Sequence, residues 1–297
     1  MSYITKIMNR GYLNWLPDSV YLKMRYYDRM GHHLHLERPI TFSEKLQWLK
    51  LYDRKPIYSI MVDKYAVKRY VAEKIGDKYI IPNVTEKMWK KYEEIDFSHL
   101  PERFVLKCSH DSGGLVICTD KRTLNHEWAK RKLNTSMKNN YYLSNREWPY
   151  KNVEPIIFAE EYQNMENAGG MIDYKFYCFN GEPQFLYVSQ GLIDHKTAKM
   201  DFLSLDWKPM PFYREDYARF SDGELPSKPK TFSEMIDVAR MLSSLIPFVR
   251  VDLYEIEGQV KFSELTFSPC GGFMKFCPNE WDEKIGAMLI LPKRKEY

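Results

Sequence analysis

A predicted β-hairpin in the last fifth of this 297-residue chain places the strongest constraint on its fold. Two runs rich in β-branched and aromatic residues, 248–254 and 260–267, flank the turn-forming pair Glu257-Gly258. A turn this short joins antiparallel neighbours, since parallel strands need a long crossover. The sequence therefore predicts a pair of antiparallel strands over this stretch.

Polar and apolar side chains alternate along both predicted strands. Because successive side chains point to opposite faces, Arg250 and Asp252 share one face of the first strand. Glu264, Thr266 and Ser268 share one face of the second. If the two faces coincide, two carboxylates and a hydroxyl meet beside an arginine, and such oxygens suit Mg²⁺. The alternative is an amphipathic edge hairpin with a solvated polar face.

The composition excludes several classes of protein. Hydrophobic residues make up 44% and charged residues 28% of the chain, as in an ordinary globular protein. The 44 basic and 40 acidic side chains leave a formal charge of +4, which is too balanced to indicate nucleic-acid binding. Five cysteines without paired close spacing indicate neither a disulfide framework nor a zinc site. No apolar run approaches the roughly 20 residues of a membrane span, so a cytoplasmic protein is expected.

The first sixty residues are expected to be mainly helical. Thr41 or Ser43 is predicted to cap a helix that continues with apolar residues at helical spacing. A further helix is predicted over 60–75. On that helix Lys64 and Lys68 would be ordinary solvated charges unless another motif gives them a role.

A second predicted hairpin carries a lysine at its base. Residues 104–108 form an apolar strand that contains Lys107, and a Gly- and Ser-rich turn at 109–114 leads to a strand at 115–118. Backbone N–H groups at such a tip can hold phosphate oxygens, and Lys107 would supply the compensating charge. The alternative is a plain tight hairpin with a snorkelling lysine.

A third predicted hairpin lies in the middle of the chain. Asn180-Gly181 is a strong turn signal between strands at 172–179 and 184–189. Further elements are predicted from local composition: a helix over 120–142, an apolar strand at 155–162, a short strand at 79–82, a loop-rich stretch at 200–230 and a helix over 233–245.

Taken in order, these motifs resemble the ATP-grasp superfamily, and more closely its TupA-like branch, which is named for teichuronopeptide biosynthesis. The last hairpin, with Arg250-Val251-Asp252 and Glu264-Leu265-Thr266, is similar to the metal-binding hairpin of D-alanine–D-alanine ligases. The segments that resemble the TupA-like branch are 39–48, 63–65, 104–107, 173–176 and 250–254.

The resemblance implies an α+β ATP-grasp fold, in which two α+β subdomains sandwich ATP, with a short helical N-terminal region. The expected domains are the helical region at 1–60, an N-subdomain or lid at 61–165, and a C-subdomain with the metal site at 166–297.

The resemblance also implies roles for individual residues, with ATP and Mg²⁺ as cofactors. Thr266 replaces the Asn of many ATP-grasp enzymes, so it is expected to be a weaker third ligand. The implied roles are phosphate contacts for Lys64 and Lys107; a loop over the β- and γ-phosphates for Ser112, Gly113 and Gly114; an adenine hinge for Glu160, Glu161, Tyr162 and Gln163; a place near the γ-phosphate for Lys175; stabilisation of the transferred phosphoryl group for Arg250; and Mg²⁺ ligation for Asp252, Glu264 and Thr266.

The activity that the resemblance implies is carboxylate–amine ligation through an acyl phosphate, with release of ADP and phosphate. The expected substrates are a uronic acid or similar carboxyl-bearing sugar, or its sugar nucleotide, and an amino acid or other amine used in bacterial surface polysaccharides. Polysaccharide-assembly proteins are expected as partners. The alternatives are an ATP-grasp kinase, a glycosyltransferase of the same pathway, and a non-catalytic scaffold.

Some further residues are weaker candidates. Arg146 and His110 would contact the acceptor or a phosphate, with an ordinary surface loop as the alternative for each. Aromatic-rich loops, including Trp207, favour sugar stacking. Cys270 and Cys277 lie near the predicted site in sequence, but buried packing is expected of them rather than catalysis.

Overall fold

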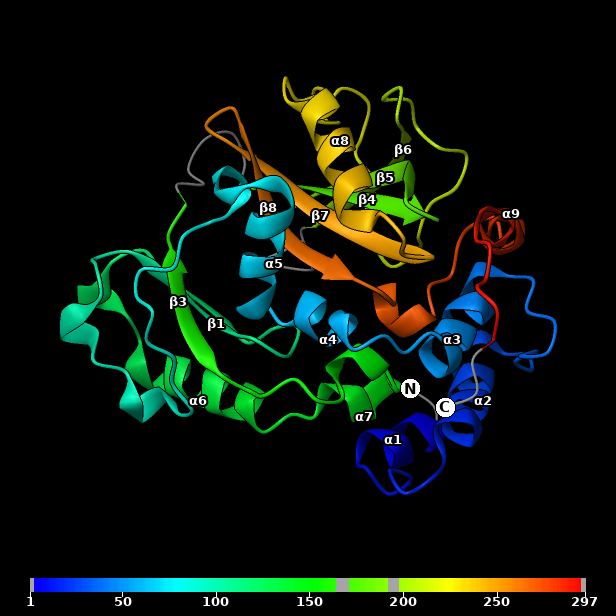
Figure 1. Cartoon of the computed structure of the whole chain (residues 1–297), viewed down its shortest axis with the longest axis horizontal. Helices are drawn as coiled ribbons and strands as arrows, with labels where there is room; N and C mark the ends of the chain where they lie inside the picture. The colour runs from blue at the N-terminus through cyan, green and yellow to red at the C-terminus, as the bar shows by residue number, and fades with distance from the viewer. Residues whose placement is uncertain (1–2, 164–170, 192–197, 295–297) are drawn as a thin grey trace. The chain divides into compact units, whose positions relative to one another are not determined.

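The computed structural model describes residues 3–163, 171–191 and 198–294, and the chain forms two compact units (Figure 1). Unit 1 comprises Met1–Lys55, Leu143–Trp148 and Met165–Tyr297, and unit 2 comprises Pro56–Tyr142 and Pro149–Asn164. Each unit combines helices with an antiparallel sheet, which confirms the predicted α+β class. The division into three domains stays a prediction.

Unit 2 is built on a three-stranded antiparallel sheet with strand order β2-β1-β3. One face of this sheet packs against α6, through a core that includes Leu106, Ala129 and Leu133. On the other face, the ring of Phe158 packs edge-on against Tyr65, with 5.5 Å between centroids. The elements are α4 (Ile57–Val62), α5 (Ala66–Ile75), β1 (Phe104–Cys108), β2 (Leu115–Cys118), α6 (His126–Met137) and β3 (Ile157–Glu161), while α7 (Tyr141–Asn145) crosses into unit 1.

Unit 1 is built on a five-stranded antiparallel sheet with strand order β6-β5-β4-β7-β8. In the described part of this unit, five helices accompany the sheet. The strands are β4 (Ile172–Phe179), β5 (Glu182–Gln190), β6 (Lys199–Ser204), β7 (Phe248–Ile256) and β8 (Gln259–Thr266). The helices are α1 (Tyr3–Asn9), α2 (Asp18–Met30), α3 (Phe42–Tyr52), α8 (Phe232–Ser243) and α9 (Glu280–Met288).

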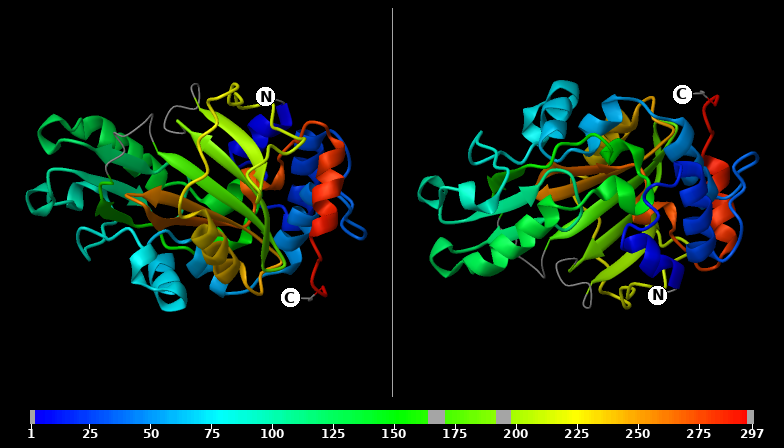
Figure 2. Two further views of the ribbon diagram at one scale, coloured as in Figure 1. Left: turned by 90° about the horizontal axis from the view of Figure 1, so that it is seen from above. Right: turned by 90° about the horizontal axis from the view of Figure 1, so that it is seen from below.

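Helices cover the two faces of this sheet differently (Figure 2). On one face α8 packs against β4, β5 and β7, and Phe232 contacts Phe176 with ring centroids 5.8 Å apart. On the other face α3 and α9 cover only the end that carries aromatic side chains, where Phe42 meets Phe248 at 4.8 Å. The rest of that second face carries the polar residues that form the candidate site.

The three hairpins predicted from the sequence are confirmed, and so is the cap of α3. Thr41 is the cap, and its hydroxyl accepts a hydrogen bond from the Glu44 N–H while the Glu44 carboxylate accepts one from the Thr41 N–H. The turn between β4 and β5 places Asn180 and Gly181 at positive φ, as a two-residue hairpin turn requires.

The helix predicted over 60–75 is wrong in one respect, because it is broken into α4 and α5. The Asp63 carboxylate accepts hydrogen bonds from the N–H groups of Tyr65 and Ala66 at 2.9 and 3.0 Å, which starts a new helix. The predicted strand at 79–82 is also wrong. Pro82 has no N–H to donate to a ladder, and the segment makes only an isolated bridge, at Asn83, to β3.

Among the strands and α-helices of the described ranges, two were not predicted. β6 lies at the start of the stretch expected to be loop-rich, and α9 lies beyond the last motif. None of the helices in the described ranges has the length and apolar character of a transmembrane span.

Candidate functional site

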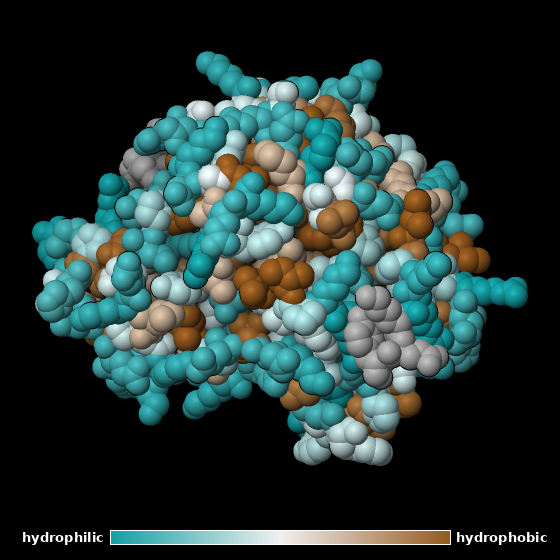
Figure 3. All heavy atoms as spheres, viewed as in Figure 1, coloured by the Kyte–Doolittle hydropathy of each residue, from teal (hydrophilic) through white to brown (hydrophobic). Residues whose placement is uncertain are grey.

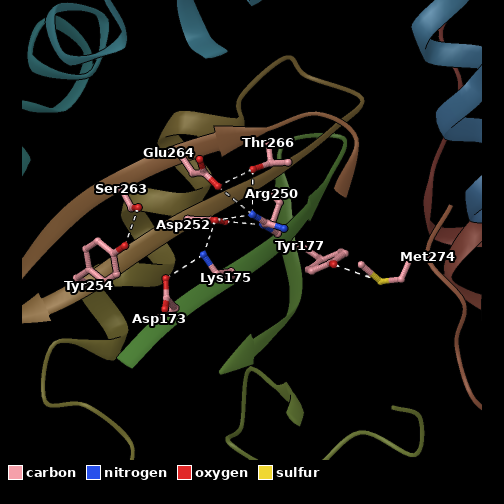
Figure 4. A network of polar contacts seen from close by, with 10 residues as sticks. All are labelled: Asp173, Lys175, Tyr177, Arg250, Asp252, Tyr254, Ser263, Glu264, Thr266 and Met274. Carbon is pink, nitrogen blue, oxygen red and sulfur yellow. Dashed lines mark hydrogen bonds and ion pairs between the residues drawn. The ribbon is translucent and has the colours of Figure 1, made fainter. Parts of the chain in front are cut away.

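The strand register of unit 1 brings the predicted catalytic and metal residues together (Figure 4). β7 lies between β4 and β8, so Asp252 has Lys175 as its partner on one side and Glu264 on the other. Arg250 lies opposite Thr266 in the same ladder. The register therefore places the two predicted polar faces on the same side of the sheet.

The guanidinium of Arg250 is the centre of this cluster. Its Nε donates to Asp252 Oδ1 at 2.7 Å, and its Nη2 donates to Asp252 Oδ2 at 2.6 Å. The same Nη2 lies 3.0 Å from Thr266 Oγ1 and 3.2 Å from Glu264 Oε1. Oxygen atoms of three side chains therefore converge on one positively charged nitrogen.

Lys175 adds a second buried cation. Its Nζ lies 2.8 Å from Asp252 Oδ2 and 2.9 Å from Asp173 Oδ1. Burial lowers the pKa of Lys175, but the two carboxylates outweigh burial, and the net shift raises this pKa well above its ordinary value. The pKa of Arg250 is raised in the same way, against burial, mainly by Asp252. Both cations therefore stay charged at neutral pH.

Asp252 is the most buried member of the cluster, with 0% of its surface exposed. Burial raises the pKa of Asp252 above its ordinary value, although Arg250 and Lys175 act against that shift. Asp173, Asp252 and Glu264 supply three carboxylates against two cations, which leaves one formal negative charge. Such a remainder favours a further cation.

The side-chain order along β4 separates the polar cluster from the aromatic end of the sheet. On β4 the same face carries Asp173 and Lys175 and then Tyr177 and Phe179, so it changes from charged to aromatic along the strand. Figure 4 shows the charged end of this face. The helices α3 and α9 pack on the aromatic end.

The donor set is compatible with Mg²⁺. The described ranges contain no group of three His, Cys, Asp or Glu side chains that could hold a metal. The oxygens that meet in this cluster are those of two carboxylates, Asp252 and Glu264, and of the Thr266 hydroxyl. Mg²⁺ usually takes one or two protein carboxylates and completes its shell with phosphates and water. Because the three oxygens already converge on a positive group, Mg²⁺ and the Arg250 guanidinium would compete for them.

Unit 2 contains a second charged cluster, centred on the buried Glu160. Lys68 Nζ lies 2.7 Å from Glu160 Oε1, and Lys107 forms an ion pair with Oε2. Burial raises the pKa of Glu160, but the two lysines reverse this, so its net shift is downward. Lys68 also donates to the Ile81 carbonyl at 2.8 Å and lies 5.4 Å from the centre of the Phe158 ring.

Lys68 is a candidate that the sequence does not reveal, because a lysine on a predicted helix is ordinarily a solvated charge. The lysine expected to act with Lys107 was Lys64, whose Nζ instead donates to the Asp111 carbonyl at 2.5 Å. Lys64 lies in the turn between α4 and α5, whereas Lys68 is in the first turn of α5, so the two lysines do not share a helix face.

The predicted adenine hinge, residues 160–163, spans the end of β3. Alternation places the Glu160 side chain with the lysines, whereas Glu161 is exposed on the opposite face, and its N–H donates to the Pro82 carbonyl at 3.0 Å. Glu161 and Tyr162 line an open hollow of about 770 Å³. Gln163 is half-buried.

The β1–β2 turn has an exposed tip and a buried base. Ser112 and Gly113 are exposed, and Gly113 has a φ of +111° with open space around it. Gly114 is needed for packing, because a side chain there would clash with Ser136 and Asp111. His110 is buried, and its Nε2 lies 3.2 Å from the Ser136 carbonyl, so it is neither a surface residue nor free to contact substrate.

Other weak candidates are corrected by their packing. Arg146 is buried, its guanidinium lies 4.1 Å from the centre of the Tyr21 ring, and its role is structural. Trp207 contacts Phe232, on the α8 side of the sheet, which removes it as a stacking surface at the polar face. Cys270 is exposed and Cys277 is half-buried, so buried packing was a wrong expectation for Cys270.

Comparisons with known proteins give one family model and several similar solved structures. A sequence model described as TupA-like ATPgrasp matches residues 44–290, and no curated protein matches significantly. The solved structures found include the ATP-grasp ligase PsnB complexed with a phosphomimetic variant of its minimal precursor, Mg and ADP (11% identity, TM-score 0.39, covering 76% of this chain and 58% of that one). Others are D-cycloserine synthetase DcsG (13%, 0.44, 78% and 70%) and D-alanine–D-alanine ligase from Helicobacter pylori (14%, 0.40, 84% and 69%).

Proposed function

The chain belongs to the TupA-like ATP-grasp family, and on this basis we propose that it is an ATP-dependent carboxylate–amine ligase. In the proposed reaction a carboxylate oxygen attacks the γ-phosphorus of ATP, the bond to the β–γ bridging oxygen breaks, and ADP leaves with that electron pair. The amine nitrogen then attacks the acyl carbon, phosphate leaves, and loss of a proton from nitrogen gives the amide.

The convergence of oxygen atoms around Arg250 is the observation that carries this proposal. Phosphoryl transfer spreads negative charge over several oxygens, so the site needs fixed positive charge rather than a protein nucleophile. Arg250 and Lys175 provide that charge from buried positions, and the carboxylates of Asp252 and Asp173 hold them in place. We assign stabilisation of the transferred phosphoryl group to Arg250 and Lys175.

Asp252, Glu264 and Thr266 are the residues that would hold Mg²⁺. When bound, the ion would neutralise charge on the phosphate oxygens. Asp252 also neutralises Arg250 and Lys175. Its carboxylate therefore stabilises both cations in their buried positions before any nucleotide binds.

Unit 2 is proposed to bind the rest of the nucleotide. The Glu160 carboxylate holds the ammonium groups of Lys68 and Lys107 close together, and both would be available to phosphate oxygens. The further proposed contacts are Lys64, Ser112, Gly113 and Gly114 for the phosphates, and Glu160, Glu161, Tyr162 and Gln163 for the adenine.

The proposed carboxylate is a uronic acid or similar carboxyl-bearing sugar, free or nucleotide-linked, and the proposed amine is an amino acid or small amine. The family's association with teichuronopeptide supports a role in bacterial surface polysaccharides.

Product analysis tests the proposal. The purified chain is incubated with ATP, Mg²⁺ and a panel of uronates and amines, and ADP, phosphate and amide are quantified, with hydroxylamine added in parallel to trap an acyl phosphate as a hydroxamate. Equal amounts of ADP, phosphate and amide are expected. A stable phosphorylated sugar without phosphate release would identify a kinase. Turnover of other carboxylates but of no uronate would contradict the proposal that the substrate is a carboxyl-bearing sugar.

A further inference from the structure

The surface formed by α1 and the turn after it is unusually apolar for an exposed region. Trp15 is 77% exposed and Tyr12 is 65% exposed, and Ile4 is also exposed. Figure 3 shows apolar and weakly polar side chains gathered at the lower edge of the molecule, where α1 lies in Figure 1. We call residues 4–15 the α1 surface.

The exposed charges of residues 3–30 all have one sign. Over residues 3–30 both acids are only partly exposed and have partners. Asp18 pairs with Arg54 at 2.7 Å, and Asp28 accepts a hydrogen bond from Thr5. The exposed charged residues of that range are Lys6, Arg10, Lys23 and Arg29.

The exposed aromatics are held on an ordered turn. Arg25 is buried and donates to Asn9 Oδ1 at 2.9 Å, which fastens the end of α1 to α2. Gly11 has a φ of +80°, and its carbonyl accepts from the Asn14 N–H at 3.0 Å. The Asn14 carbonyl in turn accepts from Arg146 at 2.9 Å. These contacts therefore hold Tyr12 and Trp15 in exposed positions.

We propose that the α1 surface binds the headgroup region of an anionic lipid bilayer. Tryptophan and tyrosine prefer the boundary between headgroups and acyl chains, and clustered basic side chains are attracted to anionic lipids. Lys6 and Arg10 are the basic residues of the α1 surface, and both are exposed. The proposal does not depend on the proposed ligase reaction.

Vesicle co-sedimentation tests the proposal with the full chain. Binding is expected to vesicles of phosphatidylcholine mixed with phosphatidylglycerol, with little binding to phosphatidylcholine alone and weaker binding as salt rises. The double variant Lys6→Glu, Arg10→Glu is expected to lower the partition constant about tenfold or more. The matched control, Lys208→Glu with Lys230→Glu, reverses two exposed charges elsewhere in unit 1 and is expected to bind like the parent chain.

The aromatic part of the proposal has its own readout. Tryptophan fluorescence is expected to shift to shorter wavelength on the mixed vesicles and to be quenched by brominated acyl chains, and Trp15→Phe is expected to lose both effects. Trp15→Gln is expected to weaken binding, whereas Leu245→Gln, at the 90% exposed Leu245, is the apolar control. Circular dichroism checks the fold of each variant. Absence of vesicle binding, equal loss in the controls, or fluorescence changes that persist in Trp15→Phe would overturn the proposal.

Discussion

Glu264 and Asp252 bind the same guanidinium but differ in burial, and this difference predicts different consequences of mutation. Asp252 has no exposed surface, whereas the Glu264 side chain is 32% exposed. An exposed ion pair contributes little to stability because water screens it, while a buried charge that loses its partner is strongly unfavourable. The role of Glu264 can therefore be tested without disturbing the fold.

The variant Glu264→Gln is expected to lower ADP formation by about 100-fold or more, because it removes one charge from the proposed metal ligands. Its free energy of unfolding is expected to change by less than about 1 kcal/mol. Steady-state kinetics and urea denaturation measure the two effects. Glu257→Gln, in the exposed turn of the same hairpin, is the control, and normal turnover with normal Mg²⁺ dependence in Glu264→Gln would contradict the assignment.

Lys68 is predicted to be a stronger nucleotide contact than its position in the sequence suggests. Lys68→Met is expected to raise the dissociation constant of an ATP analogue about tenfold, since hydrogen bonds to charged groups contribute about 1.5–3 kcal/mol. Lys74→Met, on the same helix and pointing to the Tyr70 hydroxyl, is the control. Isothermal titration calorimetry measures the dissociation constant for each variant. Equal affinities of Lys68→Met and Lys74→Met for the analogue would contradict a nucleotide contact by Lys68.

At the scale of elements, the start of α3 links local sequence to the packing of unit 1. Glu44 is buried and accepts hydrogen bonds from the N–H groups of Ile40 and Thr41 at 2.9 and 3.2 Å. Burial raises the pKa of Glu44, but these hydrogen bonds outweigh burial, and the net shift is below its ordinary value of 4.5. The carboxylate thus stabilises the folded state when it is ionised.

A pH dependence follows from this depressed pKa. The stabilisation from Glu44 is present above pH 4.5 and is lost as the pH falls through the lowered pKa of the folded state. Glu44→Gln is expected to lower stability at neutral pH and to reduce the acid-induced loss of stability. Urea denaturation at neutral and acid pH measures this, and an unchanged acid slope would contradict it.

Local patterns predicted the hairpins and the α3 cap because alternation, turn residues and capping residues act within a few positions. They did not predict the break at Asp63, since its side chain competes with a helix that the apolar spacing also favours. The pairing of Lys68 with Glu160 was missed for a different reason: it joins residues from separate elements, and no local pattern records it. The face shared by Asp252 and Glu264 needs a β-bulge as well as the turn, because the register shifts between Asp252 and Leu253 and so pairs Asp252 with Glu264 rather than with Ser263.

At the scale of the whole molecule, the two units are assembled from interrupted segments. Residues 143–148 return to unit 1 between two stretches of unit 2, and buried polar contacts bind them there. Lys50 Nζ, for example, donates to the Asn145 carbonyl at 2.9 Å. Contacts between residues so far apart in sequence leave no periodic signal, so this return could not be predicted.

Each unit has its own hydrophobic core, which predicts where a buried defect would act. Asp252→Asn is expected to cost about 3 kcal/mol, because Arg250 and Lys175 lose their shared counter-charge. Hydrogen exchange should show reduced protection in β4 and β7 and little change in β1 and β3. Equal loss of protection in both sheets would contradict a defect confined to unit 1.

The most direct test of the central claim is the binding of Mn²⁺, used in place of Mg²⁺, in the presence of a non-hydrolysable ATP analogue. Electron paramagnetic resonance measures free and bound Mn²⁺ for the parent chain, Glu264→Gln and the Glu257→Gln control. We predict nucleotide-dependent Mn²⁺ binding by the parent and the control, and a loss of about tenfold or more in affinity for Glu264→Gln. Undiminished Mn²⁺ affinity in Glu264→Gln would contradict the account.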